Sequence, residues 1–289
     1  MELTRTAAGA AALALAWTVA GGTVPRLALG IEYDGSAYSG WQAQAHAPSV
    51  QAVVEQALTA IACTPVSVTA AGRTDAGVHA CGQVVHCDVP VERPDRAWVR
   101  GVNSHLPADV GVRWVRRPGT AFDARRSASA RRYRYVLQAS PLAPVLLRHQ
   151  VAWTWKRLAL APMRAAAGCL LGEHDFSSFR AAGCQARHPV RRVHGIELSQ
   201  AGDLFIFDIE ANAFLHHMVR NIVGSLMQVG AGEQPPEWMA QVLRQRDRRE
   251  AGITAPAAGL YLLGVRYPER FGLPDPAPGP AFASSSGAE

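Results

Sequence analysis

The chain has 289 residues, and its 29 basic and 23 acidic side chains give a formal net charge of +6. Lys156 is the only lysine and no G-x-x-x-x-G-K-S/T pattern occurs, which excludes P-loop chemistry and leaves Schiff-base chemistry a single candidate. The arginine excess is typical of a protein with a polyanionic partner, although arginine-rich codon usage would produce it equally well.

The two ends of the chain differ in composition from the rest. Residues 1–25 join a basic start to an apolar, alanine-rich run that imitates a secretory signal, and we interpret them as a non-core extension. Residues 272–289, rich in proline and serine, are predicted to form a disordered tail. The five cysteines are irregularly spaced without a C-x-x-C pair, which favours reduced thiols in a cytoplasmic protein and disfavours zinc.

Residues 26–127 form the predicted first half, whose hydrophobic periodicity switches between strand and helix. Ser49 is a candidate cap for a helix with an apolar face that runs to Ile61. The expected elements are a strand at 27–33, a helix at 50–61, strands at 66–70 and 83–89, a short helix at 98–102 and a strand at 110–114. This order is βαββαβ, the ferredoxin-like split unit.

Residues 128–271 form the predicted second half, which repeats the order with insertions. The expected elements are strands at 130–138 and 151–155, a helix at 163–171, strands at 193–198 and 204–211, helices at 215–230 and 238–243, and a strand at 261–267. The fold class is therefore α+β, with two tandem ferredoxin-like (βαββαβ) halves and a cleft between them.

Arginines gather at three places along the chain. Five of the ten residues from Arg125 to Arg134 are arginine, with Tyr133 and Tyr135 interleaved, and this mixture favours nucleic acid because guanidinium groups pair with phosphates and tyrosine rings stack on bases. On a strand, the even-numbered Arg132 and Arg134 would share the face opposite Tyr133. The second cluster contains Arg187, Arg191 and Arg192, and the third, Arg244 to Arg249, is interpreted as a solvated face.

Asp75 is the charge at the centre of the stretch "AAGRTDAGVHA", where glycines bracket an Arg-Thr-Asp triplet. Three interpretations are open. Asp75 could be a turn carboxylate bonded to its own backbone, a metal ligand, or a nucleophile or general base held ionised by Arg73 or another arginine. The local sequence does not choose among them.

Five motifs resemble the bacterial tRNA pseudouridine synthase A family: "GRTDAGVHA", "GQVVH", "RRYRY", "EHDFSSFR" and "NAFLHHMVRNIVGSL". The resemblance runs from about Leu27 to Phe271, in the family's order and spacing. It implies two ferredoxin-like halves flanking a basic cleft, and a homodimer that acts on uridines 38 to 40 of the tRNA anticodon stem-loop. It also implies that neither a metal nor a cofactor takes part.

The resemblance assigns a role to four residues. Asp75 matches the catalytic nucleophile, and Arg220 matches the arginine that pairs with it and keeps it charged. Arg73 matches the arginine that assists base flipping, and Tyr133 the tyrosine that stacks on the flipped uracil.

Further matches imply contacts with tRNA. The residues are Arg93, Phe122, Asp123, Ala124, Arg125, Arg126, Gly183, Cys184, Gln185, Ala186 and Arg187. Two other functions remain open: a related synthase with another RNA target, and a non-catalytic RNA-binding protein that would keep the arginine clusters without needing Asp75 beside Arg73.

Overall fold

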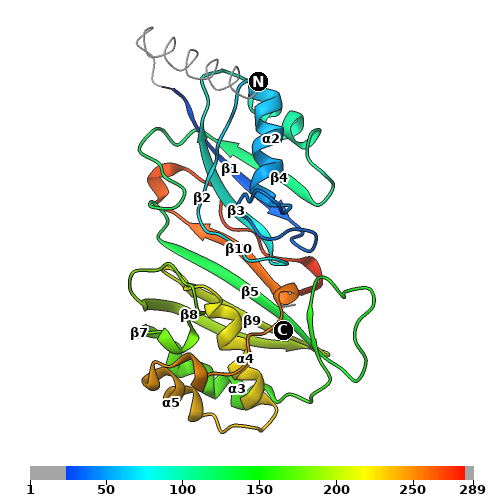
Figure 1. Ribbon diagram of the computed structural model, residues 1–289, viewed down its shortest axis with the longest axis vertical. Helices are drawn as coiled ribbons and strands as arrows, with labels where there is room; N and C mark the ends of the chain where they lie inside the picture. The colour runs from blue at the N-terminus through cyan, green and yellow to red at the C-terminus, as the bar shows by residue number, and fades with distance from the viewer. Residues whose placement is uncertain (1–23, 284–289) are drawn as a thin grey trace. The chain divides into compact units, whose positions relative to one another are not determined.

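The computed structural model describes residues 24–283, which divide into two compact α+β units. The first contains residues up to Ser129 together with Gly264–Pro276, and the second contains Ala130–Leu263 together with residues from Ala277 onward. Most of the N-terminal extension expected at 1–25 lies outside the described residues. In both units the strands pair mostly antiparallel (Figure 1).

The strands of the first unit follow the order β4-β1-β3-β2. Its elements are β1 (Arg26–Tyr33), α2 (Val50–Ala62), β2 (Thr69–Ala70), β3 (His79–Asp88), a π-helical turn η1 (Ala97–Gly101) and β4 (Val110–Arg116). β1 pairs antiparallel with β3 and β4, and β2 pairs with β3. The expected strand at 66–70 is thus reduced to Thr69–Ala70, and the expected short helix is a single π-helical turn.

Ser49 precedes α2, as the sequence predicted, but its hydroxyl makes no capping hydrogen bond. The amides of Val50 and Gln51 instead donate to the backbone carbonyls of Gly40 and Trp41, at 3.3 and 2.9 Å. Another stretch of chain therefore supplies the acceptors that a capping side chain usually provides. The buried Ser49 hydroxyl has no hydrogen-bond partner among the described residues.

The strands of the second unit follow the order β10-β5-β9-β8-β7, and β6 pairs in parallel with β5. The elements are β5 (Ala130–Ala139), β6 (Ala152–Thr154), α3 (Leu160–Ala167), β7 (Gly172–Asp175), β8 (Val190–Ala201), β9 (Leu204–Ala211), α4 (Met218–Gly230), α5 (Trp238–Gln245) and β10 (Leu260–Arg266). Short 3-10 turns are η2 (Gly168–Leu170), η3 (Ser177–Phe179), η4 (Arg248–Glu250), η5 (Ala257–Gly259), η6 (Glu269–Phe271) and η7 (Ala281–Ala283).

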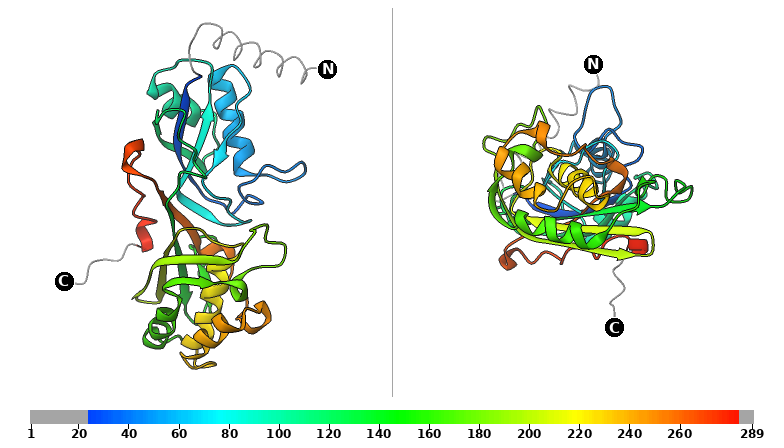
Figure 2. Two further views of the ribbon diagram at one scale, coloured as in Figure 1. Left: turned by 90° about the vertical axis from the view of Figure 1, so that its left-hand side faces the viewer. Right: turned by 90° about the horizontal axis from the view of Figure 1, so that it is seen from below.

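The amphipathic helix α4 is the central helix of this unit. It begins at Met218 rather than Leu215, because His217 adopts a left-handed conformation with φ of 59°. Its apolar face is buried, and it ends at Gly230 as expected. The helices of the unit gather on one side of its strands (Figure 2). No helix within residues 24–283 has both the length and the apolar character needed to cross a membrane.

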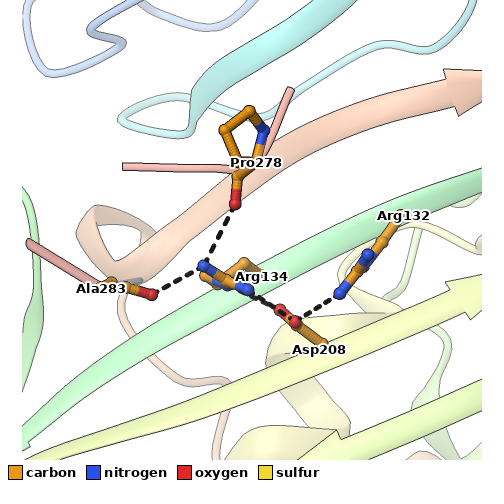
Figure 3. Close-up of polar contacts among 5 residues, drawn as sticks. All are labelled: Arg132, Arg134, Asp208, Pro278 and Ala283. Atoms are coloured by element: carbon orange, nitrogen blue, oxygen red, sulfur yellow. Dashed lines mark hydrogen bonds and ion pairs between the residues drawn. The ribbon is translucent and has the colours of Figure 1, made fainter. Parts of the chain in front are cut away.

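The face of β5 opposite Tyr133 carries an ion cluster in which Arg134 is buried and Arg132 is partly exposed (Figure 3). Arg134 donates to both carboxylate oxygens of Asp208, at 2.8 and 2.7 Å, and Arg132 donates to one of them at 2.7 Å. Arg134 also donates to the carbonyls of Pro278 and Ala283, at 3.4 and 2.7 Å. The nucleic-acid interpretation is therefore wrong for Arg134, whose guanidinium is buried in internal contacts.

The same contacts bear on the tail that composition predicted to be disordered over 272–289. Ala283 is buried, and an added Cβ on Gly279 would lie 3.0 Å from the Arg134 side chain. Residues 277–283 thus pack against the second unit and supply two hydrogen-bond acceptors to the nearly buried guanidinium of Arg134. Composition alone gave no sign of these contacts, because they depend on Arg134 far along the chain.

Candidate active site

The loop 72–77, which carries Asp75, is anchored through its middle residue. Thr74 is buried, its hydroxyl lies 2.7 Å from that of Tyr33, and its carbonyl accepts a 3.0 Å hydrogen bond from the amide of Trp41. Its two neighbours differ, since Arg73 is exposed and Asp75 is partly exposed. The anchor therefore leaves both charged side chains at the surface of the first unit.

Two further contacts fix the backbone of this loop. Gly40 has φ of +98°, and an added Cβ there would lie 2.7 Å from the carbonyl oxygen of Thr74, so only glycine permits the close approach. At the start of the loop, the Gln83 amide donates to the carbonyl of Gly72 at 2.7 Å. None of these contacts uses the carboxylate of Asp75. The loop thus has structural supports of its own, as a site for chemistry requires.

Tyr133 lies on β5 in the second unit. Its ring meets that of Phe214 edge-on, with centroids 5.0 Å apart and an interplanar angle of 82°, and 9% of the residue is exposed. Tyr135 shares this face of the strand and donates its hydroxyl to the carbonyl of Pro256 at 2.8 Å. Burial raises the pKa of Tyr135, which keeps the hydroxyl protonated as a donor. Phe214 thus packs directly against the Tyr133 ring, and the Tyr135 hydroxyl ties the same face of the strand to Pro256.

Arg220 lies in the first turn of α4 and is held by Ala255. Its Nε donates to the carbonyl of Ala255 at 2.7 Å, and the amide of Ala255 donates back to the carbonyl of Arg220 at 3.1 Å. Arg220 is only partly buried. Arg73 and Asp75 belong to the first unit and Tyr133 and Arg220 to the second, so each pair is described in its own unit. The pairing of Asp75 with Arg220 stays a prediction.

The run 122–126 alternates between buried and exposed side chains. Phe122 is fully buried, with its ring centroid 5.1 Å from that of Tyr267, and Ala124 is also fully buried. Arg125 and Arg126 are exposed, and their amides each donate to a carboxylate oxygen of Asp123 at 2.8 Å. Contacts with tRNA can therefore come from the two arginine side chains, whereas Phe122 and Ala124 can offer only backbone atoms.

The supports of this run are charged or titratable. Arg26, paired with Asp88 at 2.7 Å, donates to the carbonyl of Phe122 at 2.7 Å. The buried His86 accepts a hydrogen bond at Nδ1 from the amide of Ala124 at 3.0 Å. Burial, and then the charge of Arg26, lower the pKa of His86, so the ring stays neutral and able to accept.

The carboxylate of Asp123 is held in its charged form. Burial opposes its ionisation, but the hydrogen bonds from the amides of Arg126 and Arg125 outweigh this effect and lower the pKa of Asp123. Asp123 therefore stays ionised and orders the backbone under the two exposed arginines.

The side chain of Arg180 holds the backbone of the loop 183–187 through hydrogen bonds. This guanidinium donates to the carbonyls of Cys184 and Ala186 at 2.7 and 2.9 Å. Gly183 turns the chain with φ of +79°. Gln185 and Arg187 are exposed, and no ion pair of Arg187 occurs within residues 24–283. Arg187 is therefore the residue of this loop best suited to meet a phosphate.

Cys184 in this loop is partly buried, and its sulfur accepts a hydrogen bond from the amide of His216 at 3.4 Å. Burial acts to raise the pKa of the thiol. The hydrogen bonds from the backbone of His216 and Ala186 and from the side chain of Arg180 outweigh burial, so the pKa is lowered. Cys184 therefore links the loop to the residues that precede α4.

Of the other arginines singled out by the sequence, several are engaged internally. Arg191 is buried and donates to the carbonyl of Val190 at 2.6 Å, and Arg192 pairs with Glu173 at 3.3 Å. Of the second arginine cluster, Arg187 alone therefore lacks an internal partner among the described residues, so fewer of its charges are available to an RNA than the sequence indicated. Arg93 is exposed on the first unit, where it lines a cavity of about 480 Å³ beside Trp98.

Comparisons with known proteins identify the family to which the chain belongs. A family model described as tRNA pseudouridine synthase matches residues 30–125 and 166–268. The tRNA pseudouridine synthase A of Pseudomonas aeruginosa is 55% identical over 262 residues, which cover 90% of this chain and 92% of that protein. The chain belongs to the tRNA pseudouridine synthase A family.

Other members of the family are similarly related to the chain. The proteins of the same name from Photobacterium profundum and Escherichia fergusonii are 54% and 53% identical over 257 and 259 residues. These matches cover 89% and 90% of this chain and 98% and 96% of the relatives. Among solved structures, a Cbf5–Nop10–Gar1 complex gives a TM-score of 0.33 at 11% identity, over 70% of this chain and 45% of the other, which is too low to inform the fold.

The supporting residues carry little signal in the sequence. Phe214 lies inside the motif "NAFLHHMVRNIVGSL" and could have been proposed as a ring partner, but nothing local pairs it with Tyr133. Arg26 and His86 each make one hydrogen bond to the run 122–126, which is distant from both in sequence. Ala255 acts through its backbone alone, which no side-chain pattern can reveal.

Proposed function

We propose that this protein isomerises uridine to pseudouridine at positions 38, 39 and 40 of the tRNA anticodon stem-loop, with Asp75 as the nucleophile. The observation that carries the proposal is the loop 72–77: Thr74, Gly40 and Gln83 anchor its backbone, and they hold Asp75 in a partly exposed position beside the exposed Arg73. Family membership and the identity of the relatives support the reaction class.

The reaction conserves every atom. The N1–C1′ bond of uridine breaks, the uracil rotates, a C5–C1′ bond forms, and the proton lost from C5 is balanced by one gained at N1. A carboxylate serves three routes to this exchange: attack on C1′, attack on C6 of the base, or removal of a sugar proton. Each route needs Asp75 ionised, and we assign Arg220 to keep it so by pairing.

Two further residues act on the base. The target base lies in the stem of the anticodon stem-loop and must leave the base stack before Asp75 can reach it. We assign Arg73 to this step because its side chain is exposed beside the nucleophile. We assign Tyr133, held edge-on by Phe214, to stack on the flipped uracil.

The tRNA is held by exposed arginines on the two units. We assign phosphate contacts to Arg93, Arg125, Arg126 and Arg187, with Asp123, Gly183, Cys184, Gln185 and Ala186 shaping the two loops that carry them. Phe122 and Ala124 contribute backbone atoms only, because their side chains are buried.

The proposal extends to the architecture. We assign both units to the ferredoxin-like class, as two tandem βαββαβ halves with a basic cleft, because β4-β1-β3-β2 and β10-β5-β9-β8 follow the same order. A homodimer in the cytoplasm follows from the family resemblance, and five free cysteines are compatible with a reducing compartment. Light scattering of the purified protein tests the dimer.

The test is Asp75→Asn, assayed by carbodiimide mapping of pseudouridine in tRNA. Asn is an accepted turn residue, so a purely structural Asp75 would tolerate the change, whereas a nucleophile would not. We expect folding and tRNA affinity to persist and pseudouridine at positions 38 to 40 to disappear. Asp203→Asn, in the turn beside Gly202, is the matched control and should keep full activity. Turnover above a few per cent in Asp75→Asn would refute the nucleophile, and product at other positions would refute the target.

A further inference from the structure

The residues 252–255, which follow η4, lie against the first half of α4 with no room for side chains at the contact. An added Cβ on Gly224 would lie 1.7 Å from the carbonyl oxygen of Ile253, and one on Gly252 would lie 2.8 Å from the backbone of Gly224. Real Cβ atoms do not approach so closely. We call this stretch the 252–255 segment, and its contact with α4 depends on both glycines.

Hydrogen bonds fix the segment at its start. The amide of Gly252 donates to the hydroxyl of Ser225 at 2.9 Å, and this hydroxyl donates to the carbonyl of Asn221 at 2.9 Å. Gly252 and Ser225 are both buried. The segment is therefore tied to the helix by a polar contact away from water, where such a contact is costly to break.

A second set of hydrogen bonds fixes the middle of the segment. The hydroxyl of Thr254 donates to Oδ1 of Asn221 at 2.6 Å and accepts from Arg248 at 3.1 Å. Asn221, which is fully buried, also accepts from Arg248 at 3.1 Å and donates from Nδ2 to the carbonyl of Phe179 at 2.8 Å. Every polar atom of the Asn221 amide group is thus engaged, and Thr254 is locked to it.

The end of the segment reaches Arg220. Ala255, which is fully buried, exchanges two hydrogen bonds with it, one to the backbone and one from Nε. Because a guanidinium is planar, fixing the direction of Nε–H also fixes the plane in which both Nη groups lie. Ala255 therefore contributes to the orientation of Arg220, and Thr254 is the residue that precedes Ala255.

We propose that Thr254 and Asn221 are positioning residues for the reaction: they hold the 252–255 segment so that Ala255 presents the Arg220 guanidinium in one orientation. The inference rests on the proposed role of Arg220 in the reaction. It adds residues that touch neither tRNA nor the reacting atoms. Displacing a charged group by about 1 Å costs on the order of 100-fold in rate, so loosening the segment should be felt at the chemical step.

The test is Thr254→Val, which keeps the shape of the side chain and removes its hydrogen bonds. We expect the single-turnover rate of pseudouridine formation to fall about 10-fold or more. The Kd for tRNA should stay within about two-fold, because the change leaves the exposed arginines intact. Thr254→Ser, which keeps the hydroxyl, should restore most of the rate.

Thr154→Val is the matched control for this substitution. Thr154 is buried on β6, and its hydroxyl accepts a 3.2 Å hydrogen bond from the amide of Lys156, so the same chemical change removes a contact that does not involve the 252–255 segment. We expect its single-turnover rate to match that of the unmodified protein. An equal loss in Thr154→Val and Thr254→Val would mean that any loosened hydrogen bond slows the enzyme, and would overturn the inference.

A double-variant cycle with Arg220→Ala separates positioning from general stability. If Thr254 acts through Arg220, adding Thr254→Val to Arg220→Ala should cause no further loss of rate. Losses that multiply would overturn the inference while leaving the role of Arg220 intact. A fully active Arg220→Ala would instead overturn the proposed function. Should Thr254→Val not fold, Ser225→Ala, which removes the hydrogen bond from Gly252 and the one to the carbonyl of Asn221, is measured in the same cycle against the same outcomes.

Discussion

The carbonyl oxygen of Ile253 lies where a side chain on Gly224 would begin, 1.7 Å from the Cβ position. Gly224→Ala should therefore force the 252–255 segment away from α4, at a cost of about 1–3 kcal/mol in the free energy of unfolding. Urea denaturation measures this cost. Gly168→Ala is the control, because Gly168 is exposed and nothing lies within 4 Å of its Cβ position, and it should leave stability unchanged or slightly higher.

Arg134 should be far more important for stability than its neighbour Arg132. Replacing Arg134 with Met leaves Asp208 with one partner and removes the donor to Pro278 and Ala283, at a cost of about 3–5 kcal/mol. Arg132→Met removes a single hydrogen bond of a more exposed side chain and should cost at most about 1 kcal/mol. Limited proteolysis should also cut residues 277–283 in the Arg134 variant first. Equal stability of the two variants would contradict this ranking.

His86 should make the protein less stable in acid. Its pKa is lowered in the folded state, so below its ordinary value of about 6.5 the unfolded chain takes up a proton that the folded chain resists. The stabilisation is complete above that pH and is lost as the pH falls toward the folded pKa. His86→Asn keeps an acceptor for the amide of Ala124 without titrating. Thermal unfolding at about pH 7.5 and 5.5 should show a smaller drop in Tm for the variant.

Arg125 and Arg126 should contribute to the salt dependence of tRNA binding. Replacing both with Ala should weaken binding and reduce the slope of log K against log salt by about 0.7–0.9 for each phosphate that the variant can no longer neutralise. Arg192→Ala is the control, since Arg192 already pairs with Glu173. An unchanged slope in the double variant would mean that the two arginines form a solvated face.

Elements whose periodicity is local could be predicted from the sequence. The alternating run 27–33 became β1, and the amphipathic helix ends at Gly230 as expected. The strands expected at 193–198 and 204–211 became β8 and β9, which pair antiparallel. In these cases neighbouring side chains already determine which face is buried, so a short window of sequence contains the answer.

Predictions that depended on distant partners were less accurate. Ser49 is in the expected place for a cap, but the carbonyls of Gly40 and Trp41 satisfy the first helical amides instead. Arg134 was grouped with the nucleic-acid arginines because its partners, Asp208 and residues 277–283, are remote in sequence. The sequence could place both residues on their elements, but it could not show which groups they meet.

The candidate site shows the same division. Roles for Asp75, Arg73, Tyr133 and Arg220 were predicted because these residues lie in motifs that resemble a family, and the roles stay predictions. The role of the 252–255 segment could not be predicted from the sequence. Its contacts depend on the close backbone approach that Gly224 permits and on the carbonyl of Ala255. Such backbone contacts leave no characteristic side chain in the sequence.

The first unit is completed by residues that are synthesised late. The buried ring of Phe122 packs 5.1 and 5.2 Å from the rings of Tyr267 and Phe271, and Tyr267 donates its hydroxyl to the carbonyl of Ala124. A ribosome must translate all of Ala130–Leu263 before these partners emerge, which takes about 7–27 s at a typical rate of synthesis. During that interval the nascent chain exposes Phe122, and we expect chaperones that bind apolar segments during translation to engage the chain there.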